Sequence, residues 1–282
     1  MIQHSSSSFD FNTPPNIVEA ARKVLGRIDL DPASSDLGNT IVQASRIYTL
    51  AQNGFTKPWY RGAPEFASNV FLNPPGGKCD VDGTPATKRH PGAPYTRVTD
   101  SQPPKKLLSA QKTWWYKLVD EYCSRRVASA IFVCFSIELL QNAQVTEFSM
   151  DLPTDFPICY PRTRLAYYKN ESGKLVKAVQ PPHASCIIYL PPDSPSDRLT
   201  RFREVFGEIG VVVVPDYERY RIADGLQLSE RKRALHRALS AAEKPDKPPH
   251  CPKCGWTAMP SGIEIAPWRC ENVGCGHSFR QR

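Results

Sequence analysis

Residues 70–78 of this chain read VFLNPPGGK. The three apolar residues predict a buried strand, and that strand ends at Asn73 rather than at an ordinary turn. Two prolines then fix two successive φ angles and remove two N–H donors, whereas the two glycines restore freedom. The stretch therefore predicts a strand whose carboxyl end holds the Asn73 amide and the carbonyl groups beside it in a fixed pose.

Strands and helices alternate on both sides of this stretch. Apolar residues at helical spacing follow Thr-Pro-Pro, with Thr13 suited to an N-cap and Gly26 to the stop. Continuous apolar runs predict strands that are covered on both faces. The further elements expected are strands within 27–32, 128–135, 184–190 and 211–214 and helices over 113–122 and 198–206. This alternation predicts an α/β fold with a mostly parallel sheet and helices on both faces.

Composition divides the 282 residues into three parts. Residues 1–222 form the main domain, with a Pro-, Gly- and Lys/Arg-rich insertion at 79–112 that lacks hydrophobic periodicity. A loop of that length is typically functional or disordered, and we expect this one to close over DNA. Residues 223–249 predict a basic helix and a Lys/Pro linker. Residues 250–282 are too few for an apolar core and need a staple.

Charge and cysteine content narrow the class of protein. The formal net charge of +8 favours an anionic partner such as nucleic acid. The longest apolar run, residues 127–140, is too short to span a bilayer and includes Glu138. No basic stretch followed by an apolar one opens the chain, so we expect no secretory signal and no membrane partner. Nine cysteines, two of them in CxxC, favour reduced thiols and a metal site in the cytoplasm.

Four of those cysteines form two pairs near the C-terminal end, in CPKCG and CENVGCG. Two thiolate pairs separated by a stretch that can form a hairpin supply four sulfurs to a tetrahedral, structural Zn²⁺. His250 and His277 are alternative ligands for one position. The expected metal ligands are Cys251, Cys254, Cys270 and Cys275. The arrangement resembles a zinc ribbon, whose aromatic and basic residues suit nucleic acid or fill its small interior.

Asn73 has a chemical use at the carboxyl end of a strand, where ligands collect in open α/β sheets. It offers a carbonyl acceptor and an amide donor, and Pro74 adds a second, rigidly held carbonyl. Two acceptors side by side suit a planar amino group. Accepting both of its hydrogens draws the nitrogen lone pair out of conjugation, so that the nitrogen attacks an electrophile without a strong base. The expected catalytic residues are Asn73, Pro74 and Pro75.

Asn-Pro-Pro followed by an aromatic residue is the catalytic signature of amino-directed, S-adenosylmethionine-dependent methyltransferases. The chain resembles a narrower group, the phage-type DNA N6-adenine methyltransferases, over roughly residues 11–215. The resemblance rests on six blocks in order: FNTPPNIVEAA, IDLDPAS, NGFTKPW, VFLNPPGG, FPICYPRTRLAYY and PPHASCIIYL. It implies a Rossmann-like methyltransferase sheet and a cytoplasmic enzyme of a bacterial host, phage or prophage. The implied reaction transfers a methyl group to N6 of adenine in DNA.

The same resemblance implies the cofactor site. Thr13 and Pro14 would line the methionine end of S-adenosylmethionine, and Asp29 or Asp31 would contact its amino or ribose groups. The implied cofactor-binding residues are Thr13, Pro14, Asp29, Asp31, Pro32 and Ala33. The sequence departs from the methyltransferase pattern here, because LDPASSDLGN replaces the usual glycine-rich loop and Gly38 comes late.

A second departure concerns Gly76, which stands where the family has the aromatic residue that stacks on the extruded base. The candidate rings elsewhere are Trp59, Tyr95, Trp114 and Trp115. Of the adjacent tryptophans, we expect one to pack the helix on the sheet and the other to face the site. The expected substrate-binding residues are Gly76, Trp114, Arg162 and Arg164. The two arginines fit either phosphate contact or a solvated hairpin edge, and Cys79 is interpreted as a bystander thiol.

Other functions fit the same residues. Two acceptors also fit cytosine N4, an RNA base or a protein glutamine side chain, so methylation of another planar nitrogen is an alternative. A rival of a different class is a catalytically silent DNA-binding protein. In that protein the zinc ribbon and the basic helix would bind DNA, and Gly76 would mark a decayed site.

Overall fold

The computed structural model describes residues 11–63, 66–136, 139–140, 153–177, 184–192 and 196–214, and three short strands near the C-terminal end. The chain divides into two compact units. The first comprises Met1–Ala143 with Leu152–Pro215, and the second comprises Gln144–Asp151 with Asp216–Arg282. Within the described residues, no helix combines the length and apolar character needed to cross a bilayer.

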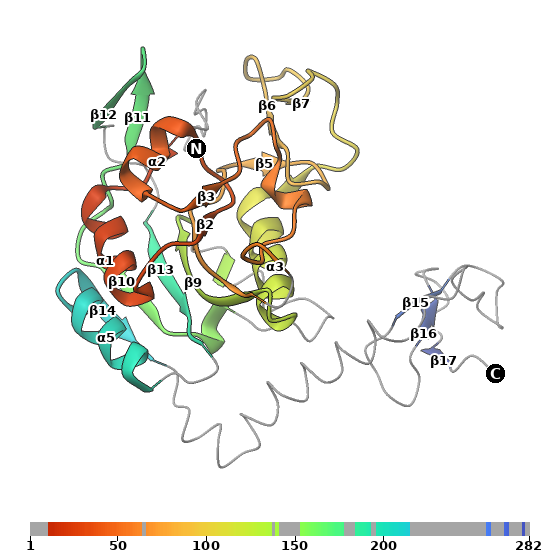
Figure 1. Cartoon of the computed structure of the whole chain (residues 1–282). Helices are drawn as coiled ribbons and strands as arrows, with labels where there is room; N and C mark the ends of the chain where they lie inside the picture. The colour runs from red at the N-terminus through yellow and green to blue at the C-terminus, as the bar shows by residue number, and fades with distance from the viewer. Residues whose placement is uncertain are drawn as a thin grey trace. The chain divides into compact units, whose positions relative to one another are not determined.

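The first unit is built on a seven-stranded sheet of order β14-β10-β13-β9-β4-β2-β3 (Figure 1). Its strands are β2 (Leu30–Asp31), β3 (Arg46–Ile47), β4 (Ser68–Leu72), β9 (Val127–Cys134), β10 (Ile158–Pro161), β13 (Cys186–Leu190) and β14 (Gly210–Val213). Parallel pairing joins β2 to β3 and to β4, and β4 to β9. The remaining pairs, β9 with β13, β13 with β10 and β10 with β14, are antiparallel.

The expected Rossmann-like architecture, a mostly parallel sheet with helices on both faces, is therefore wrong. The large sheet is mixed, every other sheet of the described residues is antiparallel, and those residues form four α-helices against many strands. The apolar runs indicated burial, which says nothing about strand direction. Along the chain, the described strands β10 to β12 come between β9 and β13, whereas in the sheet β9 and β13 are antiparallel neighbours.

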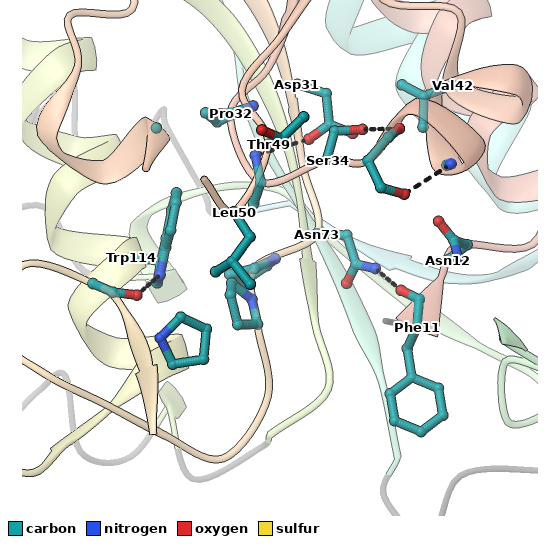
Figure 2. A pocket seen from close by; sticks show the side chains of 18 of the residues that line it. Phe11, Asn12, Asp31, Pro32, Ser34, Val42, Thr49, Leu50, Asn73 and Trp114 are labelled. Carbon is teal, nitrogen blue, oxygen red and sulfur yellow. Dashed lines mark hydrogen bonds between the residues drawn. The ribbon is translucent and has the colours of Figure 1, made fainter. Parts of the chain in front are cut away.

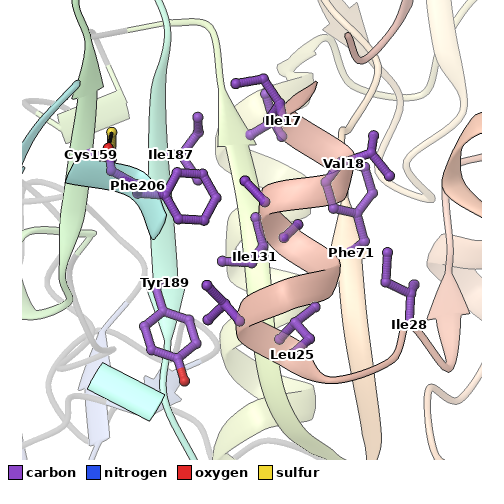
Figure 3. Close-up of a cluster of buried hydrophobic side chains, with 14 of the residues drawn as sticks. Ile17, Val18, Leu25, Ile28, Phe71, Ile131, Cys159, Ile187, Tyr189 and Phe206 are labelled. Atoms are coloured by element: carbon purple, nitrogen blue, oxygen red, sulfur yellow. Dashed lines mark hydrogen bonds between the residues drawn. The ribbon is translucent and has the colours of Figure 1, made fainter. Parts of the chain in front are cut away.

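One apolar core fixes the sheet to two helices. Helix α1 (Pro15–Leu25) and helix α5 (Ser196–Gly207) lie side by side (Figure 1). Figure 3 shows Ile17 of α1 and Phe206 of α5 in a common cluster with Ile131 and Ile187 of the sheet. Burying such side chains stabilises the fold by about 1.5–3 kcal/mol each. The carboxyl ends of the strands are thereby held in a rigid register.

The start of α1 differs from the expectation. Pro15 occupies the first helical turn, Pro14 is the N-cap, and no side chain caps the helix. The prediction that Thr13 is the N-cap is therefore wrong. Gly26 follows the helix with φ of 79°, and its N–H donates to the Arg22 carbonyl oxygen, as a helix stop requires.

The insertion folds into a second sheet, of order β7-β6-β5-β8. Its antiparallel strands are β5 (Lys78–Cys79), β6 (Pro85–Thr87), β7 (Thr96–Arg97) and β8 (Leu108–Ser109). An ion pair braces it, because Arg97 Nη1 lies 2.7 Å from Asp80 Oδ2 and 3.1 Å from Asp82 Oδ2. Burial opposes ionisation of Asp80, but hydrogen bonds from Arg97 and from backbone N–H groups outweigh it and lower the pKa of Asp80 to about 2.

A third sheet contains the first described strand, and Phe11 of that strand binds Asn73, which follows β4 of the seven-stranded sheet. Strand β1 (Phe11–Asn12) pairs antiparallel with β11 (Tyr168–Glu171), which pairs with β12 (Lys174–Lys177). Helix α2 (Asp36–Val42) follows β2, and Ser35 caps it by accepting from the Gly38 N–H at 3.0 Å. Helix α3 (Ala110–Cys123) follows the insertion, and its Trp115 packs edge to face on Phe132 of β9.

The second unit contains a three-stranded antiparallel sheet of β15 (Ala258–Pro260), β16 (Trp268–Cys270) and β17 (Ser278–Phe279). The register places Ala258, the first residue of β15, opposite Cys270, the last residue of β16. The other expected zinc ligands, Cys251, Cys254 and Cys275, lie outside the described residues. The predicted basic helix and linker at 223–249 and both alternative histidine ligands lie outside them as well.

Candidate functional site

A cavity of about 510 Å³ lies where the four parallel strands end. The residues that line it next to these ends are Thr49, Leu50 and Ala51 after β3, Asp31–Asp36 at and after β2, Asn73–Gly76 after β4, and Phe135 after β9. The other walls include Phe11, Asn12 and Thr13 at β1 and Gly83, Thr84 and Pro85 of the insertion. Ligands bind at such strand ends because several loops and backbone groups converge there.

Asn73 lines this cavity, and a hydrogen bond fixes the orientation of its side-chain amide. Its Nδ2 donates to the Phe11 carbonyl oxygen at 2.8 Å, and Figure 2 shows this bond. Because the partner is a carbonyl, the amide must turn its NH₂ toward Phe11, which leaves Oδ1 on the other side. That oxygen is buried and has no hydrogen-bond partner among the described residues. A buried polar atom without a partner costs about 1–3 kcal/mol, and a donor brought to this oxygen would remove that cost.

Asp31 is the second polar group of the cavity. Its side chain is buried, and its Oδ1 accepts from the Ala33 N–H at 3.2 Å (Figure 2). Burial raises the pKa of Asp31 to about 7, and hydrogen bonds from Ala33 and Ser34 offset only part of that effect. Burial therefore favours the protonated form of this carboxyl group, and a cationic ligand group beside it would stabilise the charged form.

The structure distinguishes Asp31 from Asp29. Asp29 Oδ1 pairs with Arg27 Nε at 2.8 Å, and its Oδ2 accepts from the Asn69 N–H at 2.8 Å. These bonds fix the strand and keep Asp29 out of the cavity lining. Pro14 is outside the lining too, and its carbonyl accepts from the first turn of α1. Of the expected cofactor residues, those that line the cavity are Thr13, Asp31, Pro32 and Ala33.

The Thr13 hydroxyl is free for a ligand. It is buried, lines the cavity and has no hydrogen-bond partner among the described residues. As Thr13 does not cap α1, its hydroxyl can donate to or accept from a bound molecule.

The two adjacent tryptophans have different environments. Trp114 lines the cavity, and its Nε1 donates to the Gly83 carbonyl oxygen at 3.4 Å (Figure 2). Its ring packs against Phe55 and Trp59, with centroid distances of 5.4 and 6.3 Å. Trp115 instead is fully buried and packs edge to face on Phe132 and Phe156. Tyr95, the remaining candidate ring, lies under Lys88 and does not line the cavity.

The arginine pair does not reach the cavity. Arg162 donates to the carbonyl oxygens of Glu208 at 2.6 Å and Gly207 at 3.0 Å, and so satisfies the carboxyl end of α5. Arg164 is exposed. Neither side chain lines the site that contains Asn73, so their predicted contact with substrate has no support in this cavity.

Cys79 has the environment of an inert thiol. It is buried, and burial raises its pKa to about 11, with a hydrogen bond from Thr113 acting in the opposite direction. Within the described residues, no group of three histidine, cysteine or acidic side chains is placed to bind a metal ion.

Many residues of the lining give no signal in the sequence as site residues, and Phe135 and Leu50 are two examples. Phe135 is the last residue of an apolar run that predicts a strand, and Leu50 lies in a stretch without clear periodicity. Leu50 is 49% exposed although it lines the cavity (Figure 2). Only the order of the strands brings both of them to Asn73.

Comparisons of this chain with family profiles, with curated proteins and with solved structures found no match. The functional assignment therefore depends on the cavity and on the chemistry of the residues around it.

Proposed function

We propose that the chain transfers a methyl group from S-adenosylmethionine to the N6 amino group of adenine in DNA. The observation that carries this proposal is the orientation of the Asn73 amide. Its donor is occupied by the Phe11 carbonyl, and its buried acceptor has no partner among the described residues. An acceptor held in this way at a strand end is suited to an amino group that must be polarised before it reacts.

The reaction needs little beyond this positioning. The Asn73 Oδ1 and the Pro74 carbonyl accept the two hydrogens of the amine and localise the lone pair on its nitrogen. S-adenosylmethionine supplies the electrophilic methyl group, so the nitrogen–carbon bond forms as the sulfur–carbon bond breaks, sulfur keeps the electron pair and the amine proton passes to solvent. Pro74 and Pro75 keep the two acceptors rigid, because proline fixes φ.

Four features of the cavity support a cationic nucleoside as cofactor. Asp31 offers a carboxyl group that a nearby cation would ionise, and Thr13 offers a hydroxyl without a partner. The volume of about 510 Å³ lies within the range of small-molecule sites. Pro32 and Ala33 add an apolar wall between these polar groups.

The choice of DNA rests on charge and on the insertion. The chain carries a net charge of +8, and Lys88 and Arg89 are exposed in the same insertion that lines the cavity. The choice of adenine N6 comes from the resemblance of the sequence blocks, since the two acceptors alone fit any planar amino group. We also propose that Zn²⁺ is bound by the four C-terminal cysteines and staples the second unit.

Transfer of tritiated methyl groups tests the central proposal. Wild type is incubated with labelled S-adenosylmethionine and unmethylated duplex DNA, and the DNA is digested to nucleosides to identify the labelled base. We expect N6-methyladenine, and we expect Asn73→Ala to lower kcat about 10²–10³-fold while cofactor affinity stays unchanged. Asn16→Ala makes the same chemical change at an exposed position of α1 and should behave as wild type.

The alternatives give distinct results in the same assay. Full activity of Asn73→Ala would refute the two-acceptor mechanism. Label in cytosine, in RNA or in glutamine of added protein would keep the mechanism and change the substrate. Cofactor binding without transfer to any of these acceptors would favour the catalytically silent DNA-binding protein.

A further inference from the structure

The two positions after Pro75 have glycine for different reasons. Gly77 has φ of 73°, in the left-handed region where side chains are strained. Gly76 is not among the residues with positive φ, so its backbone would accept a side chain. A Cβ built on Gly76, however, would lie 3.1 Å from Cε2 and 3.3 Å from Cζ of Phe135. The space beside Gly76 is already filled by an aromatic ring.

Phe135 reaches this place from the neighbouring strand. Strands β4 and β9 run parallel with Leu72 opposite Phe132, so the residues that follow both strands emerge at the same edge. The Phe135 N–H donates to Gln111 Oε1 at 3.3 Å, which ties its backbone to α3. Its ring packs edge to face on Tyr167, with a centroid distance of 6.3 Å and an interplanar angle of 79°. The ring is therefore held in one place while it lines the cavity.

The other aromatic residues of the lining are less available. Phe71 is completely buried and belongs to the apolar core, and Trp114 is only 3% exposed between two other rings. Figure 2 shows the Phe11 ring directed away from Asn73, although its carbonyl binds the amide. Phe135 is half-buried and adjoins the Asn-Pro-Pro turn directly.

We propose that Phe135 is the surface on which the target base stacks, and that Gly76 is small because this ring occupies its side-chain space. This inference rests on the proposed function, since it concerns the base that presents its amino group to Asn73. An extruded base needs an aromatic or apolar face to replace the stacking it loses in the duplex. The neighbouring strand supplies that face here, so the turn itself needs no ring.

Exchange of the ring between the two positions tests the proposal. We expect Phe135→Leu to lower kcat/KM for DNA about 10- to 100-fold, the loss typical of one base-stacking contact, without changing the Kd for S-adenosylmethionine. Gly76→Tyr alone should also be impaired, because two rings would compete for one space. The double variant Gly76→Tyr/Phe135→Ala should regain much of the activity. Phe66→Leu, at an exposed ring outside the lining, is the matched control.

Recovery in the double variant is a result that a merely structural role of Phe135 would not give. Activity of Phe135→Leu within about twofold of wild type would overturn the inference, as would a double variant no better than either single one. The second criterion holds even if Phe135→Leu folds poorly.

A binding measurement separates this inference from the proposed function. Saturation-transfer NMR follows 2′-deoxyadenosine 5′-monophosphate on wild type, Phe135→Leu and Phe66→Leu in the presence of S-adenosylhomocysteine. If wild type methylates no DNA but Phe135→Leu alone loses the nucleotide signal, the stacking surface stands and the proposed function fails. If wild type methylates DNA and Phe135→Leu keeps both activity and signal, the proposed function stands and this inference fails.

Discussion

Asp31 shows how one buried carboxyl group links pH to ligand binding. It lies in the cavity wall with its pKa raised to about 7 by burial. Because the folded protein holds the proton more tightly than the unfolded chain does, ionised Asp31 opposes folding. The stability that protonated Asp31 contributes is complete below about pH 4 and is lost as the pH rises through 7. A cationic ligand beside the carboxylate would reverse that loss.

We expect the affinity for S-adenosylmethionine to rise with pH up to about 7. Below the pKa of Asp31, a proton must leave before the carboxylate pairs with the cationic amino group. The Kd for S-adenosylmethionine should therefore increase about tenfold for each unit by which the pH falls below that pKa. Titration calorimetry between about pH 5 and 7.5 measures this slope. Asp31→Asn should flatten it, whereas Asp36→Asn, at an exposed acid of the same wall, should keep it. Equal pH dependence of Kd in wild type and Asp31→Asn would contradict the role of Asp31 in binding the cationic amino group.

The sequence predicts those site residues that adjoin their own strand. Asn73 stands at the end of an apolar run, Asp31 ends a short predicted strand that also contains Asp29, and both Asn73 and Asp31 line the cavity. Phe11 and Phe135 depend on pairing between distant segments, and no local pattern reveals such pairing. The choice between Asp29 and Asp31 was equally hidden, because it depends on the ion pair that Arg27 forms with Asp29.

At the scale of elements, apolar runs located the strands without giving their directions. The runs at 128–135 and 184–190 correspond to β9 and β13, but these two strands are antiparallel neighbours. The strands of the insertion were missed because two or three residues are too few to show a period of two. Polar contacts around Arg97 hold that sheet together, so its sequence resembles a loop.

The insertion sheet gives a prediction about DNA affinity. Lys88 and Arg89 are exposed there, and we expect Lys88→Gln/Arg89→Gln to weaken DNA binding at low salt. If each contacts one phosphate, the slope of log K against log[salt] should fall by about 2. Fluorescence anisotropy of a labelled duplex at several KCl concentrations measures both quantities. Lys174→Gln/Lys177→Gln removes the same charge from β12, and an equal effect there would show non-specific attraction instead.

At the scale of the whole molecule, composition indicated a separate C-terminal part, and the second unit includes the three-stranded sheet there. Antiparallel pairing puts the start of β15 and the end of β16 at the same end of a hairpin. Cys254 precedes β15 by a few residues, and Cys270 ends β16. Zinc binding by the four C-terminal cysteines remains a prediction.

We expect the full chain to contain about one zinc ion, as a four-cysteine site would hold. Removal of zinc with a chelator should abolish a separate unfolding transition of the second unit and leave that of the first unit unchanged. Atomic emission gives the metal content, and calorimetry gives the transitions. Cys270→Ser should lose zinc, whereas Cys123→Ser, in α3, should retain it. Metal-free wild type, or full occupancy in Cys270→Ser, would rule out the staple.

The bond between Asn73 and Phe11 also has a consequence for how the chain matures during translation. Phe11 belongs to β1, and β1 is held by β11, which is synthesised well after Asn73. At about 5–20 residues per second, that delay is on the order of ten seconds. A nascent chain thus exposes its Asn-Pro-Pro turn before any partner orients the amide. Under the proposed mechanism, the Asn73 amide is oriented for catalysis only after the β11–β12 hairpin has left the ribosome and β11 has paired with β1.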